Sequence, residues 1–117
     1  IIDKHIFIGK KYIKNHIRMI LLEDPEANLM GLMRMGVVVK RSTQQDYYSK
    51  VSRGKTFLEQ GIKESKPTYF NSIIEECLGQ VLDLAVVKLH PALGHAGRQH
   101  LTAKECRLHI QGCISSV

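Results

Sequence analysis

Cysteine and histidine side chains near the end of the chain have a spacing that suits metal binding. Cys106, His109 and Cys113 read C-x2-H-x3-C, and on a continuous helix these positions share one face. Thiolate and imidazole are common zinc ligands, but a structural zinc site needs four of them. The fourth would have to come from the loop upstream. Because cysteines often fill core space as small apolar side chains, we predict no metal and keep this zinc set as an alternative.

Two other chemistries find weaker support in the residues. A catalytic Cys–His pair needs a thiol in an electropositive, accessible loop, and none of the three cysteines occupies an evident one. The glycine-containing loop Gly94–Gly97 lacks the spacing of a phosphate-binding P-loop. We therefore predict no catalytic residues and no cofactor in this chain, and whether it belongs to an enzyme stays open.

Basic residues are numerous and unevenly distributed. There are 17 Lys and Arg against 11 Asp and Glu, a net charge of +6 with a pI near 9.4, which favours an anionic partner. Five bases and no acid lie between Lys4 and Arg18, and six bases with one acid lie between Arg34 and Lys55. Such runs are often only a solvated surface. The alternative is a surface that contacts a nucleic-acid backbone.

Length and composition limit the organisation of the chain. At 117 residues it corresponds to one domain or a fragment of a larger one. No apolar run approaches the roughly 20 residues that span a bilayer, so no membrane partner is predicted. Three cysteines without paired spacing suit a reducing compartment, nuclear or cytoplasmic, and a viral source is one alternative.

The local patterns predict short strands followed by helices. Segments 5–9 and 12–17 read as β segments around a tight Gly9-Lys10 turn, MGVVVKR as a strand, and LDLAVVKL as a strand-like run. Helices are expected from Ser42 to about Ile62, from Pro67 to Val81, and from Leu101 to Ile110.

These elements define the predicted fold class. It is α+β, with short antiparallel β segments at the N-terminus followed by a mainly helical half. The predicted boundary lies near Ser42, which divides the chain into residues 1–41 and 42–117.

Several motifs occur in an order that resembles one known family. IFIGKKYI looks like the lysine–tyrosine hairpin late in the palm of family B DNA polymerases, and MGVVVKR is similar to the β run and basic pair that follow it. NSIIEECLGQVLDLAVVKL and QHLTAKECRL are similar to the family's thumb segments. The chain departs from the pattern at Lys40-Arg41-Ser42, where Arg-Arg-Asp is common, and at Gln99, where proline precedes the histidine. Neither metal-binding aspartate motif of the palm is present.

The resemblance implies the C-terminal palm edge and thumb of a DNA-directed DNA polymerase. Such a part would grip duplex primer–template independently of sequence, would be inactive alone, and would belong to a longer chain that binds Mg²⁺ elsewhere. A grip of this kind contacts phosphates and minor-groove acceptors that all base pairs share. The nucleic-acid-binding residues implied are Lys10, Lys11, Tyr12, Lys14, Lys40, Arg41 and Lys88.

Alternatives remain for the residues and for the whole chain. Tyr12 is also explained as a packing residue, and Lys88 as a surface lysine whose stem covers apolar atoms. The chain as a whole is alternatively a small basic domain, viral or part of a ribonucleoprotein, that binds RNA or protein without catalysis. A zinc-stabilised adaptor is the third alternative.

Overall fold

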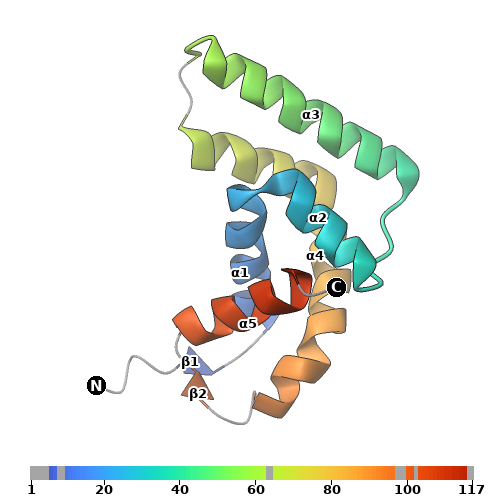
Figure 1. Cartoon of the computed structure of the whole chain (residues 1–117), viewed down its shortest axis with the longest axis vertical. Coiled ribbons are helices and arrows are strands. Elements are labelled where there is room, and N and C mark those ends of the chain that lie inside the picture. Colours follow the sequence, from blue (N-terminus) through green and yellow to red (C-terminus); the bar gives the residue numbers. More distant parts are fainter. Residues whose placement is uncertain (1–5, 8–9, 63–64, 97–99, 102, 116–117) are drawn as a thin grey trace.

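Helices make up most of the described chain, and two short strands in it pair with each other. The computed structural model describes residues 6–7, 10–62, 65–96, 100–101 and 103–115. Five helices and two strands occur in these ranges (Figure 1). In chain order they are β1 Ile6–Phe7, α1 Lys10–Glu23, α2 Pro25–Arg34, α3 Arg41–Glu59, α4 Lys66–Ala96, β2 His100–Leu101 and α5 Ala103–Ser115.

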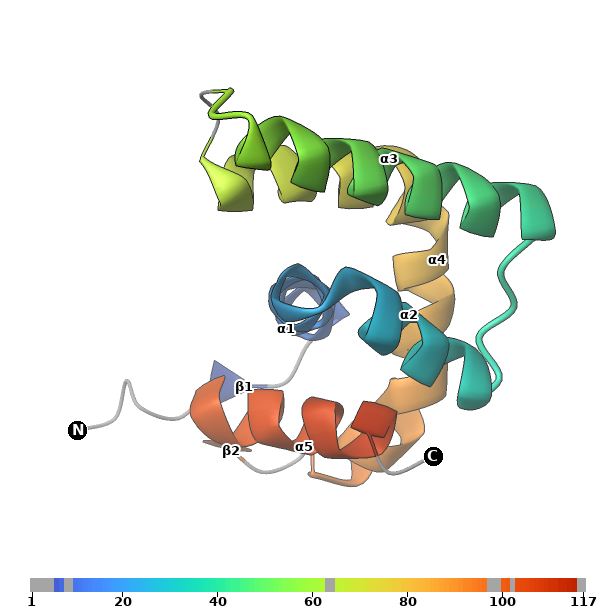
Figure 2. The same cartoon turned by 45° about the horizontal axis from the view of Figure 1, so that its top comes forward.

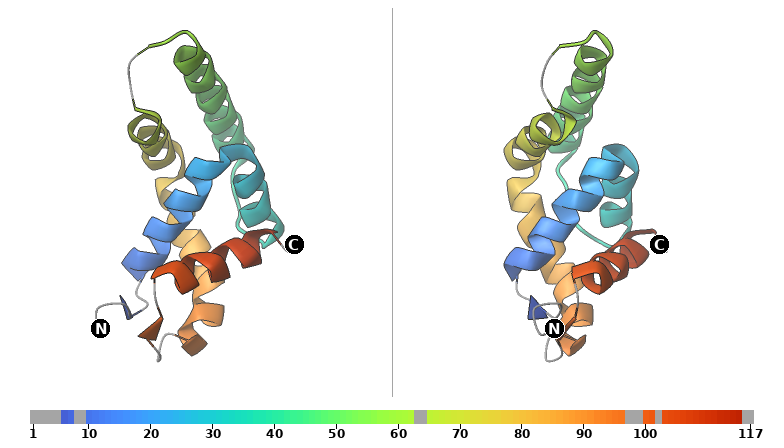
Figure 3. Two further views of the ribbon diagram at one scale, coloured as in Figure 1. Left: turned by 60° about the vertical axis from the view of Figure 1, so that its left-hand side comes forward. Right: turned by 90° about the vertical axis from the view of Figure 1, so that its left-hand side faces the viewer.

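The helix α1 lies at the centre of the fold. It packs against α4 on one side and α5 on the other, and α2 follows it after a sharp corner. The helix α4 bends, so that its first part runs along α3 and its second part passes α1 (Figure 2). The side views show α3 and the start of α4 extending beyond the other helices as a pair (Figure 3).

Apolar periodicity explains why α1 is a helix. Its buried side chains are Ile13, His16, Ile17, Ile20 and Leu21, which recur at intervals of three and four residues. At the corner, Asp24 caps α2 by accepting a hydrogen bond from the Ala27 amide at 3.3 Å. Pro25 occupies the first turn, where its missing amide hydrogen costs nothing.

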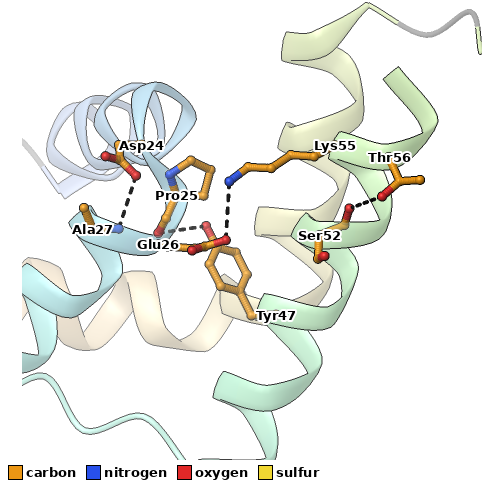
Figure 4. A network of polar contacts seen from close by, with 8 residues as sticks. All are labelled: Asp24, Pro25, Glu26, Ala27, Tyr47, Ser52, Lys55 and Thr56. Atoms are coloured by element: carbon orange, nitrogen blue, oxygen red, sulfur yellow. Dashed lines mark hydrogen bonds and ion pairs between the residues drawn. The ribbon is translucent and has the colours of Figure 1, made fainter. Parts of the chain in front are cut away.

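One apolar core unites the helices. It contains residues from all five helices and from the segment 37–39, on both sides of position 41. Tyr47 from α3 and Phe70 from α4 are its largest fully buried side chains. The Tyr47 hydroxyl donates to the Pro25 carbonyl at 3.5 Å and so ties α3 to the α1–α2 corner (Figure 4).

The α+β prediction is wrong. Residues 12–17 belong to α1, and the two-residue strand β1 pairs antiparallel with β2 rather than with a neighbouring hairpin strand. Isoleucine and tyrosine favour strands locally, but tertiary packing of a helical apolar stripe outweighs that preference. Gly9 of the predicted turn lies outside the described residues.

Two further strand predictions are wrong for different reasons. The segment Val37–Val39 has the alternation of a strand, since Val37 and Val39 are buried and Val38 is 75% exposed, but it is assigned to no strand. LDLAVVKL lies within α4, where Leu82, Ala85, Val86 and Leu89 are buried at helical spacing.

The three helix predictions are confirmed in outline. The helix expected from Ser42 begins one residue earlier, with Lys40 as its N-cap, and ends at Glu59. Pro67 is the second residue of α4, and the expected apolar stripe from Phe70 to Val81 is buried except at the half-buried Cys77. The last helix, α5, starts and ends later than expected.

Candidate functional site

The bases of the N-terminal segment lie on α1. Lys10 is the first residue of the helix, and its side chain is outside the described part of the structure. Lys11 and Tyr12 are exposed at the start of the helix. Lys14 forms an ion pair with Asp83 of α4 at 2.7 Å, and Arg18 pairs with Glu75 of the same helix. The predicted contact residues of this segment are thus partly engaged within the protein.

A groove separates α1 from the second part of α4. It has a volume of about 500 Å³. Its lining consists of Lys11, Lys14, Asn15, Arg18, Asp83, Val86 and Val87.

Lys40 and Arg41 lie where the extended segment meets α3. Both are exposed, Lys40 at the N-cap and Arg41 as the first helical residue. Lys40 lines a second hollow of about 600 Å³, whose other walls include Val38, Asp83 and Leu84. Asp83 borders both hollows, so Lys11 and Lys40 approach the same stretch of α4 from opposite sides.

Lys88 extends over the turn that follows α2. A Cβ atom at Gly36 would lie 3.2 Å from the Lys88 ammonium nitrogen, so the lysine end rests on this glycine. Gly36 has φ of 97°, a conformation that side-chain-bearing residues rarely adopt. Lys88 is exposed and forms no ion pair within the described residues.

Three exposed apolar side chains occupy the middle of this surface. Leu84 and Val87 are neighbours on α4, 47% and 62% exposed, and Val38 shares the second hollow with Leu84. We call this surface the docking face. It consists of Val38, Leu84 and Val87 at the centre and Lys11, Lys40 and Lys88 around them. The structure therefore brings three segments that are distant in the sequence together at one place.

Most other bases near the docking face are neutralised by acids. Lys50 of α3 contacts Glu76 and lies 3.5 Å from Asp46. Its hydrogen bond to Glu76 raises the pKa of the ammonium group, which stays charged at neutral pH. Glu75, Glu76 and Asp83 form an acidic strip along α4, so the surface carries charges of both signs.

The cysteine and histidine set does not converge on one point. Cys106 is fully buried in the core, where burial raises the pKa of its thiol. His109 is exposed and Cys113 half-buried, with Nε2 and Sγ 3.6 Å apart. Within the residues that the structure describes, no three His, Cys, Asp or Glu side chains come together as a metal site.

Cys77 has the features of an unreactive thiol. Its Sγ donates to Asp46 Oδ2 at 3.4 Å. Burial, together with this hydrogen bond, raises the pKa of Cys77 to about 11, so the thiol is protonated at neutral pH.

Electrostatic contacts also close the corner between α2 and α3. Lys55 of α3 lies 3.4 Å from Glu26 of α2, next to the Tyr47 hydrogen bond (Figure 4). Burial is the main cause that raises the pKa of the Tyr47 hydroxyl, so it remains a neutral donor. These contacts position α3, whose N-cap Lys40 belongs to the docking face.

None of the described helices is both long and apolar enough to cross a bilayer. Comparisons with known proteins gave no matching family model, no matching curated protein and no matching solved structure. The resemblance to family B DNA polymerases thus rests on sequence motifs alone and stays a prediction.

Sequence reasoning identified the bases of the docking face but not its apolar centre. Local patterns place Val38 in one predicted strand, and Leu84 and Val87 together in a second, strand-like run. A helical projection of residues 80–88 would have shown Leu84 and Val87 next to Asp83 and Lys88, on the side opposite the buried Leu82 and Val86.

Proposed function

We propose that this protein is a non-catalytic binding module whose docking face receives an acidic amphipathic helix of a partner protein. The observation that carries the proposal is the exposure of Leu84 and Val87 three residues apart on α4, with Val38 lining the same hollow as Leu84 and lysines nearby. Scattered single apolar residues are normal on surfaces, whereas a contiguous patch with a polar rim is typical of an interaction site.

Charge complementarity selects the occupant. Lys11, Lys40 and Lys88 form no ion pair among the described residues, so they are available to carboxylates of a partner. A helix in a groove buries apolar residues at intervals of three and four and keeps its flanks polar. Glutamates on those flanks would meet the lysine rim, which favours association and sets orientation.

Binding of designed peptides tests the proposal. The probe is a helical peptide with leucines at positions i, i+3, i+4 and i+7 and glutamates on both flanks. We expect this peptide to bind in the micromolar range, and a peptide with lysines in place of the glutamates to bind at least tenfold more weakly. Val87→Asp should abolish binding, because it puts an unpaired acid at the apolar centre.

Ile62→Asp is the matched control for that variant. Ile62 is 51% exposed, like the docking residues, but lines a different hollow near the end of α3. Its substitution should leave the peptide affinity unchanged. Equal affinity of both peptides, or equal loss in the two variants, would contradict the proposal.

Duplex DNA, the partner that the resemblance implies, is the second candidate. Its support is the exposure of Lys11, Lys40, Arg41 and Lys88 together with the net charge of +6. With about four neutralised phosphates, log affinity should fall against log salt with a slope near −3.5. Lys11→Ala should weaken duplex binding equally for unrelated sequences. If DNA is the partner, Val87→Asp should lower the duplex affinity only through its added negative charge.

The state of the cysteines bears on the cellular compartment of the protein. Cys77, Cys106 and Cys113 are free thiols, which supports a reducing compartment, nuclear or cytoplasmic.

A further inference from the structure

A histidine and a cysteine on α5 present their metal-binding atoms side by side. His109 and Cys113 are four residues apart and so lie on one face of the helix. The Nε2 atom of His109 is 3.6 Å from the Sγ atom of Cys113. The docking face is built from α1, α4 and the segment around Val38, so this pair is a separate feature.

The separation of the two atoms fits a shared zinc ion. With bonds of about 2.3 Å to sulfur and 2.0–2.1 Å to nitrogen at a tetrahedral angle, two ligand atoms lie about 3.6 Å apart. Two ligands at i and i+4 of one helix are also the arrangement by which H-E-x-x-H helices hold zinc. The pair can therefore bind one zinc ion without a change in helix geometry.

The pair can be reached from outside the molecule. His109 is exposed and Cys113 is half-buried. Between them, Gly112 is exposed, and a Cβ atom there would find no neighbour within 4 Å. One turn back, Leu108 is 58% exposed. A second helix can thus approach α5 closely at Gly112 and cover Leu108.

Two ligands are half of what a tetrahedral zinc site needs. Cys106, the third member of the sequence motif, is fully buried in the core and does not face this pair's solvent-exposed side. No group of three potential ligands occurs in the described residues of one chain. In a two-fold symmetric dimer each partner contributes the same residues, so two pairs supply two sulfurs and two nitrogens.

We propose that His109 and Cys113 form a half-site that binds Zn²⁺ between two copies of this protein, with Cys2His2 coordination. Each zinc ion displaces the thiol proton of both Cys113 side chains, which pass to the solvent. The zinc ion and the covered Leu108 side chains hold the dimer together.

Zinc titration with a measurement of molar mass tests the proposal. With a phosphine reductant present to prevent a Cys113 disulfide, we expect a monomer without metal and a dimer with added ZnCl₂, saturating at one zinc per two chains. Co²⁺ in place of zinc should give the visible absorption of a tetrahedral site and a sulfur-to-metal charge-transfer band. EDTA should restore the monomer.

Variants separate this site from adventitious binding. His109→Ala and Cys113→Ser should each abolish the zinc-dependent dimer. His109 is exposed, and serine has nearly the size of the half-buried Cys113, so the fold should persist by circular dichroism. Cys77→Ser is the control, because it removes a thiol from α4 and should leave dimerisation intact. One zinc per chain without dimerisation, an unchanged dimer in Cys113→Ser, or no zinc bound at tenfold metal excess would each overturn the proposal. None of these outcomes depends on peptide or DNA binding.

Discussion

Lys14 and Asp83 join α1 to α4 through an ion pair of 2.7 Å. One turn further along α1, Arg18 contacts Glu75, which lies about two turns earlier on α4. From the first pair to the second, the residue number rises on α1 and falls on α4, so the two helices are antiparallel at this contact. Two of the bases that the sequence offers to a nucleic acid are thus already matched by acids of the same molecule.

Removal of the Lys14 side chain should change stability only slightly. Both partners keep substantial exposure, 30% for Lys14 and 66% for Asp83, and exposed ion pairs contribute little. We expect a coupling energy of about 0.2–1 kcal/mol from a double-mutant cycle of Lys14→Ala and Asp83→Asn, measured by urea unfolding. Lys11→Ala, next to the pair but without an acid partner, is the control and should change the free energy of unfolding by less than about 0.5 kcal/mol. A coupling above about 2 kcal/mol would mean that the pair is buried in solution.

Sequence reasoning found the helices that have strong periodicity and clear start signals. The apolar stripe from Phe70 to Val81 after Pro67 is such a case, and α4 has it buried. The sequence-based prediction was wrong at α1. Ile13 and Ile17 favour strands by local propensity, whereas their burial depends on contacts of α1 with α4 and α5. The pattern of burial in α1 arises only when distant helices pack on it.

The candidate site shows the same division. That lysines such as Lys11 and Lys40 are exposed follows from their chemistry. That Lys14 has Asp83 as its partner, and that Val38 meets Leu84, depends on helix packing between segments far apart in the chain. Local pattern predicts what a side chain prefers, and only the tertiary structure determines which side chain it meets.

A side chain at Gly31 should destabilise the protein. A Cβ atom there would contact the Ile114 side chain and lie 2.7 Å from the Ile114 carbonyl oxygen, which is backbone and cannot move cheaply. We expect Gly31→Ala to cost about 1–3 kcal/mol in the free energy of unfolding, as overpacked cores do.

Gly79→Ala is the matched control for the Gly31 variant. Gly79 lies within α4, and a Cβ atom there would have no neighbour within 4 Å. Since alanine favours helices over glycine, this variant should be neutral or more stable by up to about 1 kcal/mol. Equal effects at both positions would show that α2 and α5 do not pack as closely as described.

His16 should make stability fall in mild acid. Burial, with the nearby positive Arg107 as a smaller cause, lowers the pKa of this imidazole below 6.5, and its Nδ1 has no hydrogen-bond partner. The unfolded chain therefore binds a proton near pH 6.5 that the folded chain does not bind until lower pH. Between these two values the unfolded state holds more protons, so stability decreases as the pH falls.

The comparison with His16→Gln isolates this contribution from the other histidines. We expect the urea midpoint of the parent to fall more steeply than that of the variant between pH 7 and pH 5, with parallel curves above pH 7. The contact between Glu23 and Arg107 is common to both proteins, so it cancels in the comparison. Parallel curves throughout would show that His16 is as free to take a proton in the folded state as in the unfolded state.

The three cysteines should differ in their reactivity toward iodoacetamide. Only the thiolate reacts, and with a pKa of about 11 the Cys77 thiol is ionised to about one part in a thousand at pH 8. Cys106 is fully buried and should react only after unfolding, whereas Cys113 lies half-exposed on α5. In metal-free buffer with EDTA we expect Cys113 to be labelled first, as read by mass spectrometry of acid-quenched samples. Asp46→Asn should accelerate labelling of Cys77, since it removes the carboxylate that accepts the thiol hydrogen bond. Labelling of Cys77 as fast as Cys113 in the parent, with no response to Asp46→Asn, would contradict this order and the contact that explains it.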